Sequence, residues 1–79
     1  MRKLMNFIRG MVTVQLTGLF PERLINLCAQ ERIDFWAMEW LDEHTIRFVT
    51  RLHTLRRLKE LAGKAGCEVE QETRWGLPD

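Results

Sequence analysis

The sequence predicts one α+β domain in which a four-stranded antiparallel sheet carries two helices on one face. Two observations support this class. Four segments alternate apolar and polar residues with a period of two, which is the pattern of half-buried strands, and two segments between them repeat apolar residues at helical spacing. At 79 residues, with 46% hydrophobic and 29% charged residues, the sequence supports a single globular core.

The first strand and the first helix are marked by alternation and by two breaking residues. Residues 11–17 alternate valine or leucine with threonine or glutamine, and Gly18 ends the strand. Pro21 then has the fixed φ that suits the first turn of a helix, which we expect over residues 21–32.

The second half of the chain repeats the pattern with an extra hairpin. Strands are predicted at residues 34–41 and 45–52, joined by the polar turn 42–44. A helix follows from Leu55, where leucines and alanines recur at helical spacing. Gly66 ends that helix and leads into the last strand, whose residues again alternate.

The resulting order βαββαβ favours a ferredoxin-like arrangement, with the first and third strands in the centre and the second and fourth at the edges. We assign residues 11–75 to this domain, residues 1–10 to a short amphipathic helical lead-in, and residues 76–79 to a tail. The predicted core is Val12, Val14, Leu16, Leu24, Leu27, Cys28, Trp36, Met38, Ile46, Phe48, Leu55, Leu58, Leu61 and Val69.

The sequence indicates no catalytic or metal-binding apparatus. His44 and His53 fall at opposite ends of one predicted strand, too far apart to share a site. Cys28 and Cys67 lack the spacing of zinc ligands or of a redox pair, and both are expected to be free thiols. No phosphate-binding loop or nucleophile motif is present. We therefore expect a non-enzymatic, cytoplasmic domain without a cofactor.

Binding surfaces remain as the candidate sites. On the predicted second strand, Phe35 and Trp40 are candidate interface residues, and Arg47, Val49 and Arg51 lie on the open face of the predicted third strand. We expect a protein partner for this surface. A second copy of the chain, pairing through a sheet edge, is an alternative occupant.

The lead-in is a further candidate surface and carries basic residues. In the lead-in, Arg2, Lys3, Phe7 and Arg9 are candidates for contact with an anionic membrane surface, although we favour a first turn folded back on the domain.

Two rival functions are also open. One is a small-molecule-sensing module of ACT type, which rests on analogy of fold alone. The other is a weak binder of RNA or anionic lipid that uses Arg47, Arg51, Arg56 and Arg57. The net charge of +1 and the lack of stacking aromatic residues on the central strands argue against nucleic acid.

Several sequence motifs resemble those of a known protein family. The chain resembles the N-terminal region of the sporulation protein YqfD family at the run Val-Gln-Leu-Thr-Gly-Leu-Phe-Pro-Glu-Arg-Leu-Ile-Asn-Leu-Cys-Ala, residues 14–29. The likeness continues through Ile-Asp-Phe-Trp at 33–36, Leu-Ala-Gly-Lys-Ala-Gly-Cys-Glu-Val at 61–69 and Gly-Leu-Pro at 76–78.

The resemblance implies a membrane protein of endospore-forming Firmicutes that is needed for efficient sporulation and has no assigned enzymatic activity. In this family a transmembrane helix follows the Gly-Leu-Pro element, whereas the sequence ends at Asp79. We therefore expect the cytosolic N-terminal domain of such a protein, placed at the cytoplasmic face of a membrane and engaged in protein contacts. The resemblance implies no catalytic residue.

Overall fold

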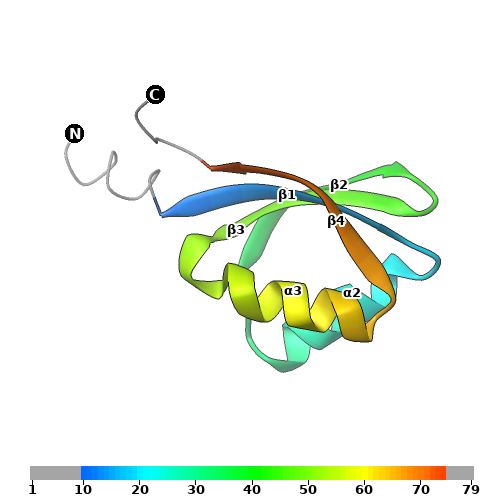
Figure 1. Ribbon diagram of the computed structural model, residues 1–79, viewed down its shortest axis with the longest axis horizontal. Coiled ribbons are helices and arrows are strands. Elements are labelled where there is room, and N and C mark those ends of the chain that lie inside the picture. The colour runs from blue at the N-terminus through cyan, green and yellow to red at the C-terminus, as the bar shows by residue number, and fades with distance from the viewer. Residues whose placement is uncertain (1–9, 75–79) are drawn as a thin grey trace.

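A computed structural model describes residues 10–74 (Figure 1). The elements are β1 (Met11–Gly18), α2 (Pro21–Gln30), β2 (Phe35–Asp42), β3 (Thr45–Arg51), the 3-10 turn η1 (Leu52–Thr54), α3 (Leu55–Lys64) and β4 (Cys67–Arg74). Each predicted strand and helix within the described residues is present in the predicted order. The predicted lead-in up to residue 9 and the tail 76–79 lie outside the described residues.

The four strands form one antiparallel sheet in the order β2-β3-β1-β4. Strands β1 and β3 are therefore central and β2 and β4 are the edges, as the sequence predicts. Both helices lie on the same side of the sheet, below it in Figure 1, so that each strand has a helix-covered side and an open side. The protein is an α+β domain with two layers.

The core lies between the helices and the covered side of the sheet. Alternation in β1 places Val12, Val14 and Leu16 inward, where all three are fully buried. The helices contribute their apolar stripes, which include Leu24 of α2 and Leu58 of α3. Of the predicted core, these positions are buried: Val12, Val14, Leu16, Leu24, Cys28, Ile46, Phe48, Leu55, Leu58 and Leu61. Leu27 and Val69 pack against the core and are partly buried.

Strand β2 departs from strict alternation, and the prediction of Trp36 and Met38 as core residues is wrong. Phe35 takes the inward position and packs against Phe48, with the ring centroids 5.2 Å apart. Trp36 lies on the open side. The register then shifts at Ala37, which has a φ of 55°, and Met38 is 37% exposed. A bulge of this kind inserts an extra residue into one strand, which a period-two pattern does not reveal.

A bulge in the pairing of β4 with β1 reverses the faces of β4. Val69 faces the helices, as predicted, but Glu70 is an extra residue between two paired positions. Beyond it Gln71 lies on the open side, whereas alternation predicts that it faces inward with Val69. Glu72 and Arg74 instead lie opposite the inward-facing valines of β1 and so face the helix side.

Candidate functional site

Strand β2 is an edge strand that exposes large apolar side chains. Met38, Trp40 and Leu41 are 37%, 47% and 42% exposed. Within residues 10–74, β2 pairs only with β3, so that the outer row of its backbone groups has no partner strand. An unpaired edge with apolar side chains is a template for the addition of another strand.

The opposite edge has a different character. Strand β4 carries carboxylates at Glu68, Glu70 and Glu72 and only one basic residue, Arg74. Charged residues on an edge strand discourage pairing with another chain. The two edges therefore differ: β4 carries three carboxylates, whereas β2 exposes large apolar side chains and carries two, Glu39 and Asp42.

The predicted interface residues are distributed over three environments. Trp40 is exposed at the β2 edge. Phe35 is partly buried and packs against the core cluster. Val49 lies on the open side but is only 6% exposed, and Met11 on the same side is similarly buried. Of these four apolar residues, only Trp40 offers substantial contact area.

The two arginines of the open side form ion pairs with carboxylates. Arg47 Nη2 donates a hydrogen bond of 2.5 Å to Glu39 Oε1. Arg51 Nε lies 3.5 Å from Asp34 Oδ2, and its guanidinium carbon lies 5.7 Å from the ring centroid of Trp36. These pairs reduce the positive field that the sequence predicts for this face.

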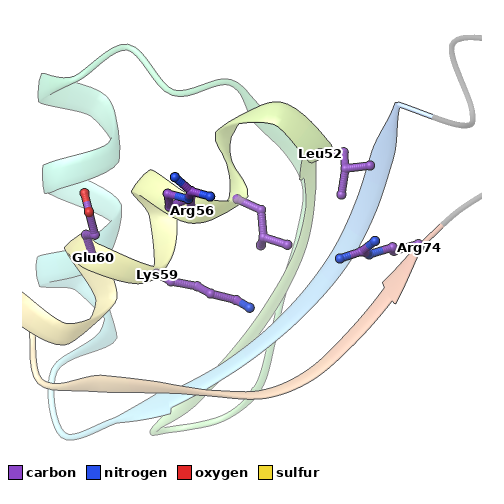
Figure 2. A pocket seen from close by; sticks show the side chains of 6 residues that line it. Leu52, Arg56, Lys59, Glu60 and Arg74 are labelled. Atoms are coloured by element: carbon purple, nitrogen blue, oxygen red, sulfur yellow. The ribbon is translucent and has the colours of Figure 1, made fainter.

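The next two predicted basic residues, on α3, behave differently from each other. Arg57 is held by Glu31 and by Glu60. Arg56 makes no ion pair within the described part of the chain. It lies instead on the rim of a groove between α3 and the end of β4 (Figure 2).

This groove has a cavity of about 670 Å³ and is lined by Leu52, Leu55, Arg56, Lys59, Glu60 and Arg74. Figure 2 shows the side chains of Lys59 and Arg74 pointing toward one another, from α3 and β4 respectively. Lys59 Nζ also contacts Glu72 Oε2 at 2.5 Å. Period-two alternation places Arg74 on the open side of the sheet, and only the bulge at Glu70 turns it toward α3.

The two cysteines are free thiols inside the core, and the two histidines lie at the surface. Burial raises the pKa of Cys28 to about 11, with a smaller contribution from the charge of Glu31, and burial likewise raises the pKa of Cys67. Such thiols are poor nucleophiles. His44 and His53 are exposed. Across residues 10–74 there is no cluster of three or more histidine, cysteine or acidic side chains with a geometry suited to a metal ion.

Two further findings concern the membrane. Neither α2 nor α3, the α-helices of the described residues, has the length and apolar composition for a membrane crossing. The predicted membrane-contact residues Arg2, Lys3, Phe7 and Arg9 lie outside the described residues.

Comparison with protein families gives one finding. The family model described as "Putative stage IV sporulation protein YqfD" matches residues 6–79. Comparison with curated proteins and with solved structures gives no significant match.

Proposed function

Because the chain belongs to the YqfD family of stage IV sporulation proteins, we propose that it serves sporulation as a non-enzymatic domain that binds another protein along the free edge of β2. The observation that carries this proposal is the exposure of Trp40, Met38 and Leu41 on an edge strand.

Strand addition would supply both affinity and selectivity. The backbone groups on the outer edge of β2 would form main-chain hydrogen bonds with an extended segment of the partner. Trp40 would anchor the contact, because tryptophan buries a large area on binding and is enriched among residues that dominate interface energies. Glu68 and Glu70 on β4 would disfavour the same contact at the other edge.

The fold itself supports an assignment to the ferredoxin-like class. Its element order βαββαβ and its strand order β2-β3-β1-β4 fit that topology. This fold class hosts many unrelated functions, so the functional proposal depends on the β2 edge and not on the topology.

The test compares two substitutions of exposed apolar residues in the intact protein of a spore-forming host. Trp40→Lys places a charge on the β2 edge, and Leu19→Lys makes the same change in the β1–α2 loop, where Leu19 is 73% exposed. We expect Trp40→Lys to lower spore yield and the amount of cross-linked protein partner, with unchanged thermal unfolding of the isolated domain. Equal spore yield and cross-linking for the two variants would contradict the proposal.

The partner strand can come from a second copy of the chain or from a different protein. Sedimentation of the purified domain distinguishes the two cases. A wild-type dimer that becomes a monomer on Trp40→Lys, and remains a dimer on Leu19→Lys, identifies a second copy as the occupant. A wild-type monomer assigns the edge to a different protein.

A further inference from the structure

Three basic residues line the groove between α3 and β4, and two of them form no ion pair with a described residue. Lys59 is paired with Glu72, and Glu60, which lies on α3 like Lys59, is paired with Arg57. The remaining charged groups of the lining, Arg56 and Arg74, make no ion pair with any described residue. Both are exposed, so that their charges are available to a ligand.

The position of Arg74 depends on a specific irregularity of the sheet. Without the extra residue at Glu70, strict alternation would place Arg74 on the open side together with Glu68. The bulge turns it to the helix side, where it lies opposite Val12 and points into the groove (Figure 2). Bulges are found where a strand re-aims a side chain toward a functional site.

The groove also has an apolar part and a suitable size. Two of its lining residues are apolar: Leu52, which is partly buried, and Leu55, which is buried. The cavity of about 670 Å³ falls within the usual range of small-ligand sites, roughly 300–1,000 Å³.

We propose that this groove binds a phosphate monoester, with Arg56 and Arg74 donating hydrogen bonds to the phosphate oxygens and Leu52 contacting the apolar part of the ester. Two guanidinium groups match the charge of a phosphate dianion, and their planar sets of N–H donors suit its oxygens. This site lies between α3 and β4, whereas the proposed protein contact uses the opposite edge of the sheet. The two proposals can therefore fail independently.

The test measures binding by calorimetric titration with two soluble probes, inorganic phosphate and phenyl phosphate. We expect phenyl phosphate to bind more tightly than inorganic phosphate, because its ring contacts the apolar lining residues Leu52 and Leu55. Arg56→Gln and Arg74→Gln are each expected to raise the Kd for phenyl phosphate about tenfold, as charge-assisted hydrogen bonds are lost. Both residues are exposed, so the domain should remain folded in both variants.

A matched control separates this site from general electrostatic attraction. Arg23→Gln removes the same charge from the first turn of α2, which follows the end of β1, whereas Arg74 lies opposite the beginning of β1. We expect Arg23→Gln to leave the Kd unchanged. An equal loss of affinity in Arg23→Gln and Arg74→Gln would overturn the proposal, since diffuse positive charge would then explain the binding.

A gain of affinity gives a second, independent readout. Glu72→Gln removes the carboxylate that neutralises Lys59 at 2.5 Å and leaves Lys59 free to contact the ligand. We expect this variant to lower the Kd several-fold, which loss of a merely structural ion pair would not do. An unchanged or higher Kd would count against a phosphate in this groove.

Vesicles distinguish the source of the phosphate. Vesicles of phosphatidylcholine with phosphatidic acid present a lipid phosphate monoester, and pure phosphatidylcholine vesicles are the control. Binding of the domain to phosphatidic acid that Arg56→Gln and Arg74→Gln weaken, without binding of phenyl phosphate, assigns the site to a lipid headgroup. Binding of phenyl phosphate without binding to vesicles assigns it to a soluble ester. Absence of binding to both probes and vesicles overturns the proposal.

Discussion

Arg57 of α3 forms a two-pronged hydrogen-bonded ion pair with Glu31, the C-cap residue that follows α2. Its Nε and Nη2 atoms donate to the two carboxylate oxygens at 2.7 and 2.5 Å. Nη1 of the same guanidinium donates to Glu60 at 2.9 Å. The geometry fixes the end of one helix against the side of the other, and the hydrogen bonds from Arg57 lower the pKa of Glu31.

This pair predicts a specific dependence of stability on pH. Because the folded state lowers the pKa of Glu31, its contribution is present above the ordinary glutamate pKa and is lost as the pH falls through the lowered pKa. Glu31→Gln should therefore be less stable than the wild type at neutral pH, and the difference should disappear in acid. Urea unfolding at a series of pH values measures this. Glu43→Gln, on the hairpin turn, is the matched control and should show no such trend.

A pair of glycines predicts opposite effects of the same substitution. A Cβ on Gly18 would lie 2.7 Å from Cys67 Sγ and 2.8 Å from the carbonyl oxygen of Gly66, which is closer than atoms can approach. Gly18→Ala should lower the free energy of unfolding by about 1–3 kcal/mol through overpacking. Gly63 in α3 has open space at the same position. Gly63→Ala should raise the free energy of unfolding by up to about 1 kcal/mol, since alanine favours helix.

Denaturant unfolding of the two alanine variants measures both changes. A stabilised Gly18→Ala variant would show that the chain relaxes around the new methyl group without cost. A destabilised Gly63→Ala variant would contradict the open environment of that helix position.

The predictable part of the fold is the part in which periodicity is unbroken. Strand β1 alternates without interruption on its inward side, and its residues Val12, Val14 and Leu16 are buried as predicted. Single-sequence patterns also locate Pro21 at the start of α2 and Gly66 after α3. These features depend on local chemistry that the sequence displays directly.

The two edge strands are less predictable, because the pairing of β2 has two register shifts and that of β4 has one. The extra residues near Ala37 and at Glu70 exchange the faces of their neighbours, and composition gives no signal for either. Period-two alternation consequently places Trp36 in the core and Arg74 on the open side, away from the groove. Both candidate surfaces of the protein lie on these irregular strands.

Thr50 forms a buried hydrogen bond that connects β3 to the loop before β2. Its side chain is fully buried, and its Oγ1 donates a hydrogen bond of 2.7 Å to the backbone carbonyl oxygen of Asp34, with Thr54 Oγ1 at 3.3 Å. Thr50→Val keeps the shape but leaves the carbonyl oxygen of Asp34 without this donor. We expect a loss of about 1–3 kcal/mol in the free energy of unfolding.

Thr50→Ser is the informative comparison in the same unfolding experiment. It keeps the hydroxyl and removes one methyl group, so that its cost should be about 1 kcal/mol from lost burial alone. If Thr50→Val were as stable as the wild type, the hydrogen bond to Asp34 would contribute nothing to folding.

The two buried thiols report on opening of the core. Cys28 is 1% exposed, and its pKa of about 11 leaves roughly one molecule in a thousand as thiolate at pH 8. Alkylation of the native protein should therefore be very slow, and it should accelerate with denaturant as the core opens.

Variants Cys28→Ala and Cys67→Ala allow each thiol to be followed alone by mass spectrometry. Because Cys67 lies at the start of edge strand β4 and Cys28 in α2, a faster rate at Cys67 would identify β4 as the element that separates first. Equal rates that follow global unfolding would show that the sheet and helices open together. Labelling of either thiol at the rate of an unfolded peptide in the absence of denaturant would contradict its burial.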